Sequence, residues 1–200
     1  MRDSAYTRAR NPEKLTDFKA LAQCAAHRTV ARIDARSVVE QTVPILFSAE
    51  MARQIFGQLA VAISGGVLYR EASFLCGALG EHIFPKFISI YQRPHLLQTV
   101  GAQPFDDEGV RTMDRTIVSD GCLQSYILSA YSARRLGLNT TGNAGGIQTW
   151  CVEDAQNLTF QDLLNKMGSG LYVTEMMGSG NHIVTGDFSR GIFGFWVEQG

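Results

Sequence analysis

Hydrophobic positions in the first third of the chain recur at helical spacing in two places. Residues 15–30 place apolar side chains at three- and four-residue intervals, with Asp17 near the start, and this predicts a first helix. Residues 49–63 predict a second helix, which Ser48 can cap and Gly65-Gly66 can end. The second helix carries one apolar stripe, formed by Met51, Ile55, Leu59 and Ile63.

Strand patterns occupy the spaces between the helices. Residues 42–48 predict a short strand that Pro44 restricts to a sheet edge or a strand start. Residues 116–119 and 122–128 flank Asp120-Gly121, the dipeptide that a two-residue hairpin turn favours. Weaker patterns predict helices at 67–79, 129–136 and 160–167, strands at 87–91, 171–176, 183–185 and 193–197, and loops at 92–108 and 137–146.

This mixture predicts an α+β fold, mainly an antiparallel sheet with packed helices. We expect an N-terminal arm and helix over residues 1–40 and a main domain over residues 41–200. The last residues, 198–200, form a turn signal that normally introduces another strand, so we expect a domain that is incomplete at its C-terminal end. Two similar Gly-Ser-Gly segments, at 168–170 and 178–180, are expected to be turns on either side of one strand.

Composition excludes several functional classes. Basic and acidic residues nearly balance, 18 against 19, so the chain has no electrostatic signature for nucleic acid or an anionic membrane surface. No apolar run approaches the length of a membrane span, and the N-terminus has no signal-peptide core. A cytoplasmic protein is the expectation.

The residue types that bind metals are dispersed. The four cysteines, Cys24, Cys76, Cys122 and Cys151, form no C-x-x-C pair, so we expect them to be small buried side chains. The four histidines are dispersed as well, and no two are one helical turn apart. We therefore expect no local metal site.

The densest polar cluster near an apolar segment spans residues 182–191. His182, Asp187 and Ser189 are candidates for a base, an orienting carboxylate and a nucleophile in a hydrolase. No Gly-x-Ser-x-Gly elbow accompanies them. The alternative is a turn in which Asp187 and Ser189 bond the backbone and Arg190 pairs with a carboxylate.

Two other polar segments have ordinary explanations. The acidic triplet at residues 106–108 has the residue type for a cation but lacks further oxygen ligands, so a solvated turn is expected. The glycine-rich segment 142–146 lacks a following Lys-Ser/Thr and is not a phosphate-binding loop. The aromatic side chains Trp150, Phe193, Phe195 and Trp196 are expected in a core or an interface.

Several long motifs resemble one family. Residues 184–191 read V-T-G-D-F-S-R-G and residues 194–200 read G-F-W-V-E-Q-G. Residues 104–110, 129–138 and 141–146 add P-F-D-D-E-G-V, S-A-Y-S-A-R-R-L-G-L and T-G-N-A-G-G. Together they resemble the TldD/PmbA family, more specifically its PmbA (TldE) branch, and the match covers most of a C-terminal domain.

The resemblance implies a cytosolic metalloprotease system in which two related subunits form a heterodimer. A TldD-type subunit carries zinc on a His-Glu-x-x-x-His segment, and the pair degrades or trims small unfolded peptides. The family is also linked to modulation of DNA gyrase. It implies as partners a TldD-type subunit and a peptide, with no direct nucleic acid or membrane contact.

Aligning the strand at 44–47 and the helix after it places Gly57-Gln58-Leu59-Ala60-Val61-Ala62 at the metal-binding segment. Gly57 and Ala62 have no ligand atom, and Gln58 cannot accept a proton as a glutamate can. We therefore expect a non-catalytic subunit with no catalytic or metal-binding residues and no cofactor of its own, the zinc being in the partner; its peptide-binding residues are not identified. The alternatives are an independent hydrolase using Ser189, His182 and Asp187, which Ser189→Ala would inactivate, or a truncated product without function.

Overall fold

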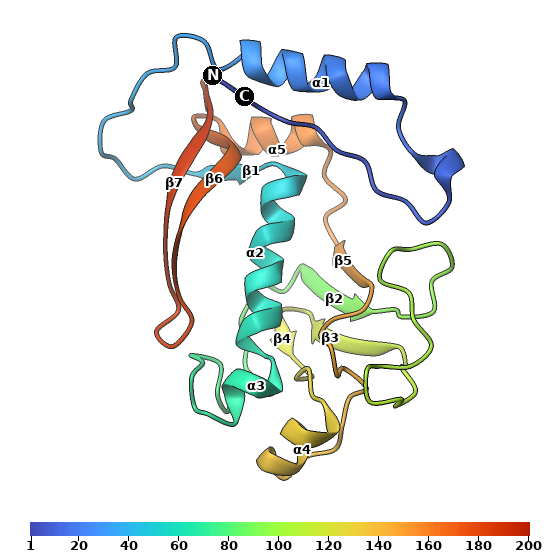
Figure 1. The fold of residues 1–200 in the computed structure, drawn as a ribbon. Coiled ribbons are helices and arrows are strands. Elements are labelled where there is room, and N and C mark those ends of the chain that lie inside the picture. The colour runs from blue at the N-terminus through green and yellow to red at the C-terminus, as the bar shows by residue number, and fades with distance from the viewer.

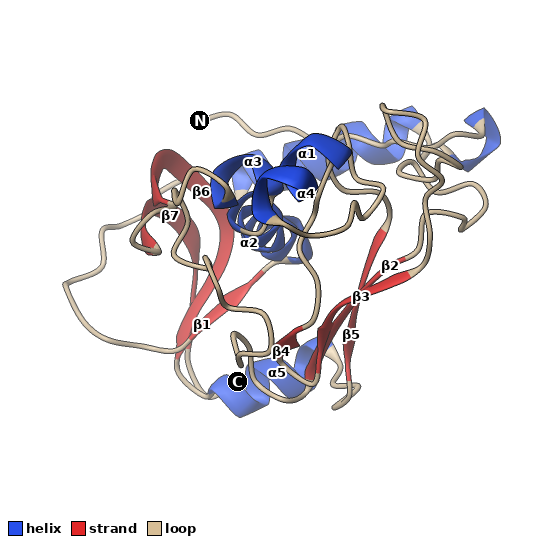
Figure 2. Cartoon of the chain, turned by 90° about the horizontal axis from the view of Figure 1, so that it is seen from below, coloured by secondary structure: helices blue, strands red, loops and turns tan.

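The computed structural model describes residues 1–200 and has two β-sheets on either side of one long helix (Figure 1). That helix, α2 (Ala49–Ala62), runs between the sheets in the view from below as well (Figure 2). One sheet has the order β1-β6-β7 and the other the order β4-β3-β2-β5. The strands are β1 (Ile45–Phe47), β2 (Ile88–Gln92), β3 (Arg115–Ser119), β4 (Cys122–Leu123), β5 (Trp150–Asp154), β6 (Gly170–His182) and β7 (Asp187–Val197).

All strand pairs except β1–β6 are antiparallel, which confirms the predicted α+β class. β1 lies at the edge of its sheet, as Pro44 predicts. The remaining helices are a 3-10 turn (Pro12–Lys14), α1 (Phe18–Val30), α3 (Gly65–Leu68), α4 (Ala130–Leu136) and α5 (Phe160–Met167).

The two helices predicted from the first third of the chain are confirmed, with side-chain caps at their starts. Asp17 accepts a hydrogen bond from the Ala20 backbone N–H at 3.1 Å. Ser48 accepts one from the Met51 backbone N–H at 3.4 Å. The predicted hairpin is also present, since Asp120 (φ 47°) and Gly121 (φ 79°) both adopt the left-handed conformation that a type I′ turn requires.

Several predicted elements differ from the structure. Within residues 67–79 only the start is helical, and Gly65-Gly66 begin α3 instead of ending α2. Segment 122–128 pairs with β3 only over β4, and further along Ile127 forms an isolated parallel bridge with Ser64. β5 was not predicted because its residues, W-C-V-E-D, show no alternation, and its pairing with β2 determines its structure.

The last two strands are longer than predicted. β6 continues through Gly178-Ser179-Gly180, where a register irregularity replaces the expected turn. Residues 183–185, predicted as a strand, form the turn between β6 and β7. The result is one long hairpin whose tip lies far from α5 and near the C-terminal end of α2 (Figure 1).

The hydrophobic core lies between α2 and the four-stranded sheet. Its largest fully buried side chains include Ile63, which directly follows α2, Ile90 of β2 and Ile117 of β3. Nearby, Tyr126 is buried, and its hydroxyl donates to the Leu75 carbonyl at 3.0 Å. This bond holds residues 69–84 against the sheet.

Tyr126→Phe should lower the free energy of unfolding by about 1 kcal/mol, because it leaves the Leu75 carbonyl without its donor. Burial raises the pKa of the Tyr126 phenol above its usual value of 10.0. The neutral phenol is therefore favoured in the folded state, and its contribution is lost as the pH rises through that raised pKa. Urea unfolding at neutral pH measures the effect. Tyr131→Phe, at a side chain 52% exposed, is the control and should change little.

The three-stranded sheet is hydrogen-bonded to the chain at both ends of α2, and the bond at the C-terminal end links it to the connection that precedes the four-stranded sheet. At the N-terminal end of α2, the Ser48 backbone N–H donates to the Val173 carbonyl of β6 at 2.9 Å. At its C-terminal end, the Phe74 N–H donates to the Ile183 carbonyl at the hairpin tip, at 3.0 Å. The N-terminal arm and α1 attach through ion pairs, Arg28–Glu50 at 2.9 Å and Arg32–Asp3 at 2.6 Å.

Candidate functional site

α2 carries the segment that the family resemblance aligns with a metal-binding motif, and its residues face three different surroundings. A Cβ on Gly57 would meet no atom within 4 Å, and Gly57 borders a hollow shared with Trp150 and Val152. Gln58 lines a pocket beside the hairpin tip. Ala62 is 1% exposed and belongs to the hydrophobic core.

The residues of this segment do not fit zinc. Glycine and alanine supply no donor atom, and Gln58 offers a neutral amide in place of a carboxylate. Ala62 also points into packed core, where a histidine side chain would have no space. No group of three or more His, Cys, Asp or Glu side chains lies close enough elsewhere to hold a metal ion.

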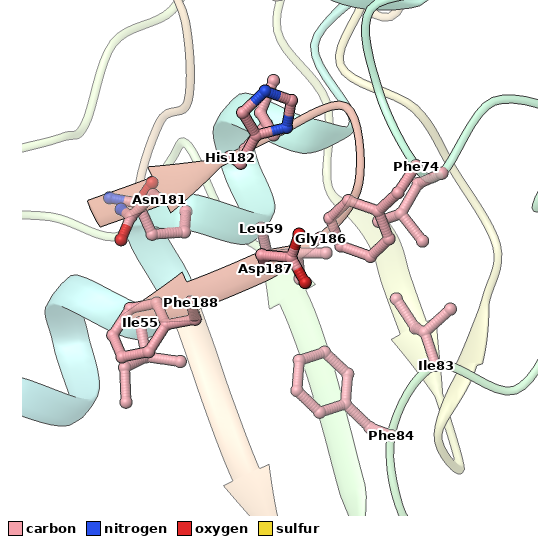
Figure 3. Close-up of a pocket in the computed structure, with 13 residues that line it drawn as sticks. Ile55, Leu59, Phe74, Ile83, Phe84, Asn181, His182, Gly186, Asp187 and Phe188 are labelled. Atoms are coloured by element: carbon pink, nitrogen blue, oxygen red, sulfur yellow. The ribbon is translucent and has the colours of Figure 1, made fainter. Parts of the chain in front are cut away.

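Gln58 lines a pocket with a volume of about 270 Å³. Three segments that are distant in sequence build it: α2, the connection before β2, and the tip of the β6–β7 hairpin (Figure 3). Most of its lining is apolar, with polar groups from the hairpin. The lining residues are Ile55, Gln58, Leu59, Phe74, Leu75, Ile83, Phe84, Asn181, His182, Ile183, Gly186, Asp187 and Phe188.

The structure brings two of the three hydrolase candidates together. His182 and Asp187 are direct partners in the β6–β7 ladder, and the Thr185 hydroxyl lies between them, 3.0 Å from His182 Nδ1 and 2.6 Å from Asp187 Oδ2. Ser189 pairs with Gly180, and its hydroxyl forms no hydrogen bond with His182 or Asp187. The hydroxyl that joins base and carboxylate is therefore that of Thr185.

The alternative prediction for this segment is also wrong, because the Asp187 carboxylate accepts the Thr185 hydroxyl and neither Asp187 nor Ser189 bonds the backbone through its side chain. Arg190 does not pair with a carboxylate. Its Nε donates to Asn181 Oδ1 at 3.0 Å, and its guanidinium carbon lies 5.7 Å from the centre of the Phe188 ring. The Arg190 side chain therefore lies along the hairpin, where its guanidinium contacts the Phe188 ring and the Asn181 side-chain amide.

The acidic triplet is a structural junction, so the prediction of a solvated turn is wrong for its first member. Asp106 is 2% exposed, and its carboxylate accepts backbone N–H groups from Glu108, Val110 and Ala144, each at 2.9 Å. Glu108 accepts the Ala130 N–H at the start of α4 at 2.6 Å. These carboxylates satisfy backbone donors, and Asp107 is exposed.

The glycine-rich loop encloses a buried amide network that sequence reasoning missed. The Asn143 side-chain amide donates to Gln92 Oε1 at 2.8 Å and to Gln148 Oε1 at 3.0 Å, and its carbonyl accepts from Thr141 Oγ1 at 2.8 Å. All four residues are buried. The sequence offers no local signal for this network, because Gln92, Asn143 and Gln148 come together only in the fold, where each buried amide finds a hydrogen-bond partner.

Other predictions for single residues had mixed outcomes. The expectation of buried cysteines is wrong, because Cys24 and Cys76 are exposed and Cys122 and Cys151 are only partly buried. Trp150 packs against the core as predicted, although its Nε1 has no hydrogen-bond partner. Phe195 and Trp196 are about two-fifths exposed on β7, so they do not belong to the core of this chain.

Comparison with known proteins places this fold in a family. Residues 40–200 match the model of the PmbA/TldA metallopeptidase C-terminal domain. The chain is 45% identical to the metalloprotease PmbA of Escherichia coli O157:H7 over 199 residues, which cover 100% of this chain and 44% of that protein. The chain therefore belongs to the PmbA/TldA metallopeptidase family and spans less than half the length of such relatives.

Solved structures agree. A candidate modulator of DNA gyrase from Bacteroides thetaiotaomicron superposes with a TM-score of 0.87 at 27% identity, covering 94% of this chain and 42% of that one. TldE from Thermococcus kodakarensis shares the fold, with a TM-score of 0.69 at 24% identity over 83% of this chain and 40% of its own. No helix of the chain has both the length and the apolar character needed to cross a bilayer.

Proposed function

We propose that this chain is the PmbA-type, non-catalytic subunit of a cytoplasmic two-subunit metalloprotease that degrades or trims small unfolded peptides. The observation that carries the proposal is the composition of α2. The helix keeps its place between the two sheets, while Gly57, Gln58 and Ala62 supply neither zinc ligands nor a general base. The zinc belongs to a TldD-type partner, whose helix supplies the ligands.

The surface of the chain supports a role in assembly. Apolar side chains stay exposed along β1 and β7, where a groove of about 560 Å³ includes Ile45, Ile192 and Trp196. Exposed apolar patches of this kind mark protein contact sites. The pocket beside Gln58 is the part of this chain that would contribute to a peptide-accepting cavity.

The near-zero net charge gives no basis for direct DNA binding. An influence on DNA gyrase, which the name of a structural relative mentions, would therefore act through a peptide or protein substrate.

The test is size-exclusion chromatography of this chain mixed with a TldD-type subunit, with zinc and peptide cleavage measured in each peak. We expect one joint peak that holds zinc and cleaves peptide. Replacing the glutamate of the partner's His-Glu-x-x-x-His segment should abolish cleavage. The matched change Gln58→Ala in this chain should leave kcat within about twofold, because Gln58 cannot act as a general base, and should alter only KM, because Gln58 lines the proposed peptide-accepting cavity.

Two outcomes would contradict the proposal. Separate peaks at micromolar concentrations would show that this chain and a TldD-type subunit do not form a complex. Zinc-dependent cleavage by this chain alone would show that it is catalytic. Metal-independent cleavage that is lost in Ser189→Ala would instead identify the hydrolase formed by Ser189, His182 and Asp187.

A further inference from the structure

The pocket beside Gln58 contains a single carboxylate, that of Asp187. In Figure 3 this carboxylate lies near the centre of the labelled side chains, beside Phe74 and above Phe84. Asp187 is exposed at this pocket, so a ligand can reach its carboxylate directly, and most of the remaining lining is apolar. A carboxylate beside an apolar lining favours a ligand that combines a cationic group with an apolar stem.

No cation of the chain neutralises Asp187. The ion pairs of the structure are Arg28–Glu50, Arg32–Asp3, Arg32–Glu175 and Arg93–Glu153. The two nearest basic side chains on the hairpin have other partners, since His182 Nδ1 meets the Thr185 hydroxyl and Arg190 binds Asn181. Asp187 itself accepts only the Thr185 hydroxyl, which leaves its other carboxylate oxygen available.

Three phenylalanine rings border the same pocket, from Phe74, Phe84 and Phe188. Phe74 is fixed in place by its backbone bond to Ile183 and by close packing on Gly186. A Cβ on Gly186, whose φ is +81°, would lie 3.1 Å from the Phe74 ring, so glycine permits this approach. Aromatic faces attract ammonium groups at exposed sites as well as at buried ones, and Phe74 and Phe188 are both exposed to an incoming group.

We propose that this pocket binds the primary ammonium group of a lysine side chain in an unfolded peptide. The ammonium pairs with Asp187 and contacts the phenylalanine rings, while the butyl stem packs on Ile55, Leu59 and Ile83. The volume of about 270 Å³ accommodates one such side chain. The inference rests on the proposed function, because it names the residue type that the peptide-accepting cavity takes from this subunit.

The test titrates the full chain, without a partner subunit, with three pentapeptides and follows binding by NMR chemical shifts. The first is acetyl-Gly-Gly-Lys-Gly-Gly-amide. The second replaces lysine with norleucine, which keeps the stem and removes the charge. The third is the norleucine peptide with a free N-terminus, which distinguishes a terminal ammonium from a side-chain ammonium as the source of the charge.

We expect the lysine peptide to bind about tenfold more tightly than the acetylated norleucine peptide. Asp187→Asn should remove that preference while keeping the bond from Thr185, and its thermal unfolding should match that of the unaltered chain. Asp120→Asn is the matched control, because it also removes one acidic charge and keeps a dipeptide that suits the β3–β4 turn. The control should retain the full preference for lysine.

Equal binding of the two acetylated peptides would overturn the inference, as would an Asp187→Asn variant that still prefers lysine. Tighter binding of the free-amine norleucine peptide than of the lysine peptide would overturn the lysine assignment and place a peptide N-terminus at Asp187. Because the chain is titrated alone, these results do not depend on complex formation. If the chain co-elutes with a TldD-type subunit but shows no preference for the lysine peptide, this inference is wrong and the proposed function is unaffected.

Discussion

Asp106→Ala is expected to lower the free energy of unfolding by about 3 kcal/mol, because three backbone N–H groups lose a charged acceptor. Those groups belong to Glu108, Val110 and Ala144, so one carboxylate joins the 104–110 turn to the glycine-rich loop. At 2% exposure, little water can replace the lost acceptor. Urea unfolding followed by circular dichroism measures the change.

Asp107→Ala is the matched control for this prediction. Its side chain is exposed and its carboxylate accepts no hydrogen bond, so the change should stay within about 0.5 kcal/mol. Equally small effects of the two substitutions would mean that the acidic triplet is a solvated turn after all. A large effect only at Asp106 would establish that this segment of the family motif serves folding.

Ala62→His is expected to destabilise the chain by about 3 kcal/mol or more, because a ring and two polar nitrogens would enter a close-packed core. Ala62 is 1% exposed and contributes to the same cluster as Leu59 and Ile63. Thermal and urea unfolding both report the loss. Gly57→His is the matched control on the same helix, and we expect it to be neutral or slightly stabilising, since its Cβ meets open space and glycine disfavours helices.

The same pair of positions determines whether zinc binding can be restored. A chain carrying Gly57→His, Gln58→Glu and Ala62→His should hold no stoichiometric zinc, because the second histidine cannot enter without disrupting the core. Zinc content after dialysis provides the measurement. A stable triple variant with one equivalent of zinc would show that α2 can present both histidines to one side, contrary to its packing here.

The sequence predicted the elements whose signals are local. The stripe on α2 and its Ser48 cap are contained within one helix, and Asp120-Gly121 sets its own turn geometry. β5 could not be predicted in this way, because its five residues have no strand pattern and pair with β2 about sixty positions earlier. The stretch after α3 has a helical pattern, but bonds from Tyr126 and to Ile183 hold it in another conformation.

The candidate site was also predictable only where its signal is local. The absence of zinc ligands in the Gly57–Ala62 segment can be read directly from the residue types in the sequence. The pocket could not, because Phe74, Phe84 and Asp187 come from segments that only the fold brings together. The pairing of His182 with Asp187 was anticipated, whereas the intervening hydroxyl of Thr185 was not.

The bonds at the two ends of α2 have a consequence for the pocket wall. Ser48 and Val173 join helix to hairpin at one end, and Phe74 and Ile183 join the tip of that hairpin to the 69–84 connection at the other. The helix, the hairpin and the 69–84 connection are therefore linked in a ring by the chain and these two backbone bonds. The pocket wall at Phe74 is thereby bonded directly to the hairpin that contains β7.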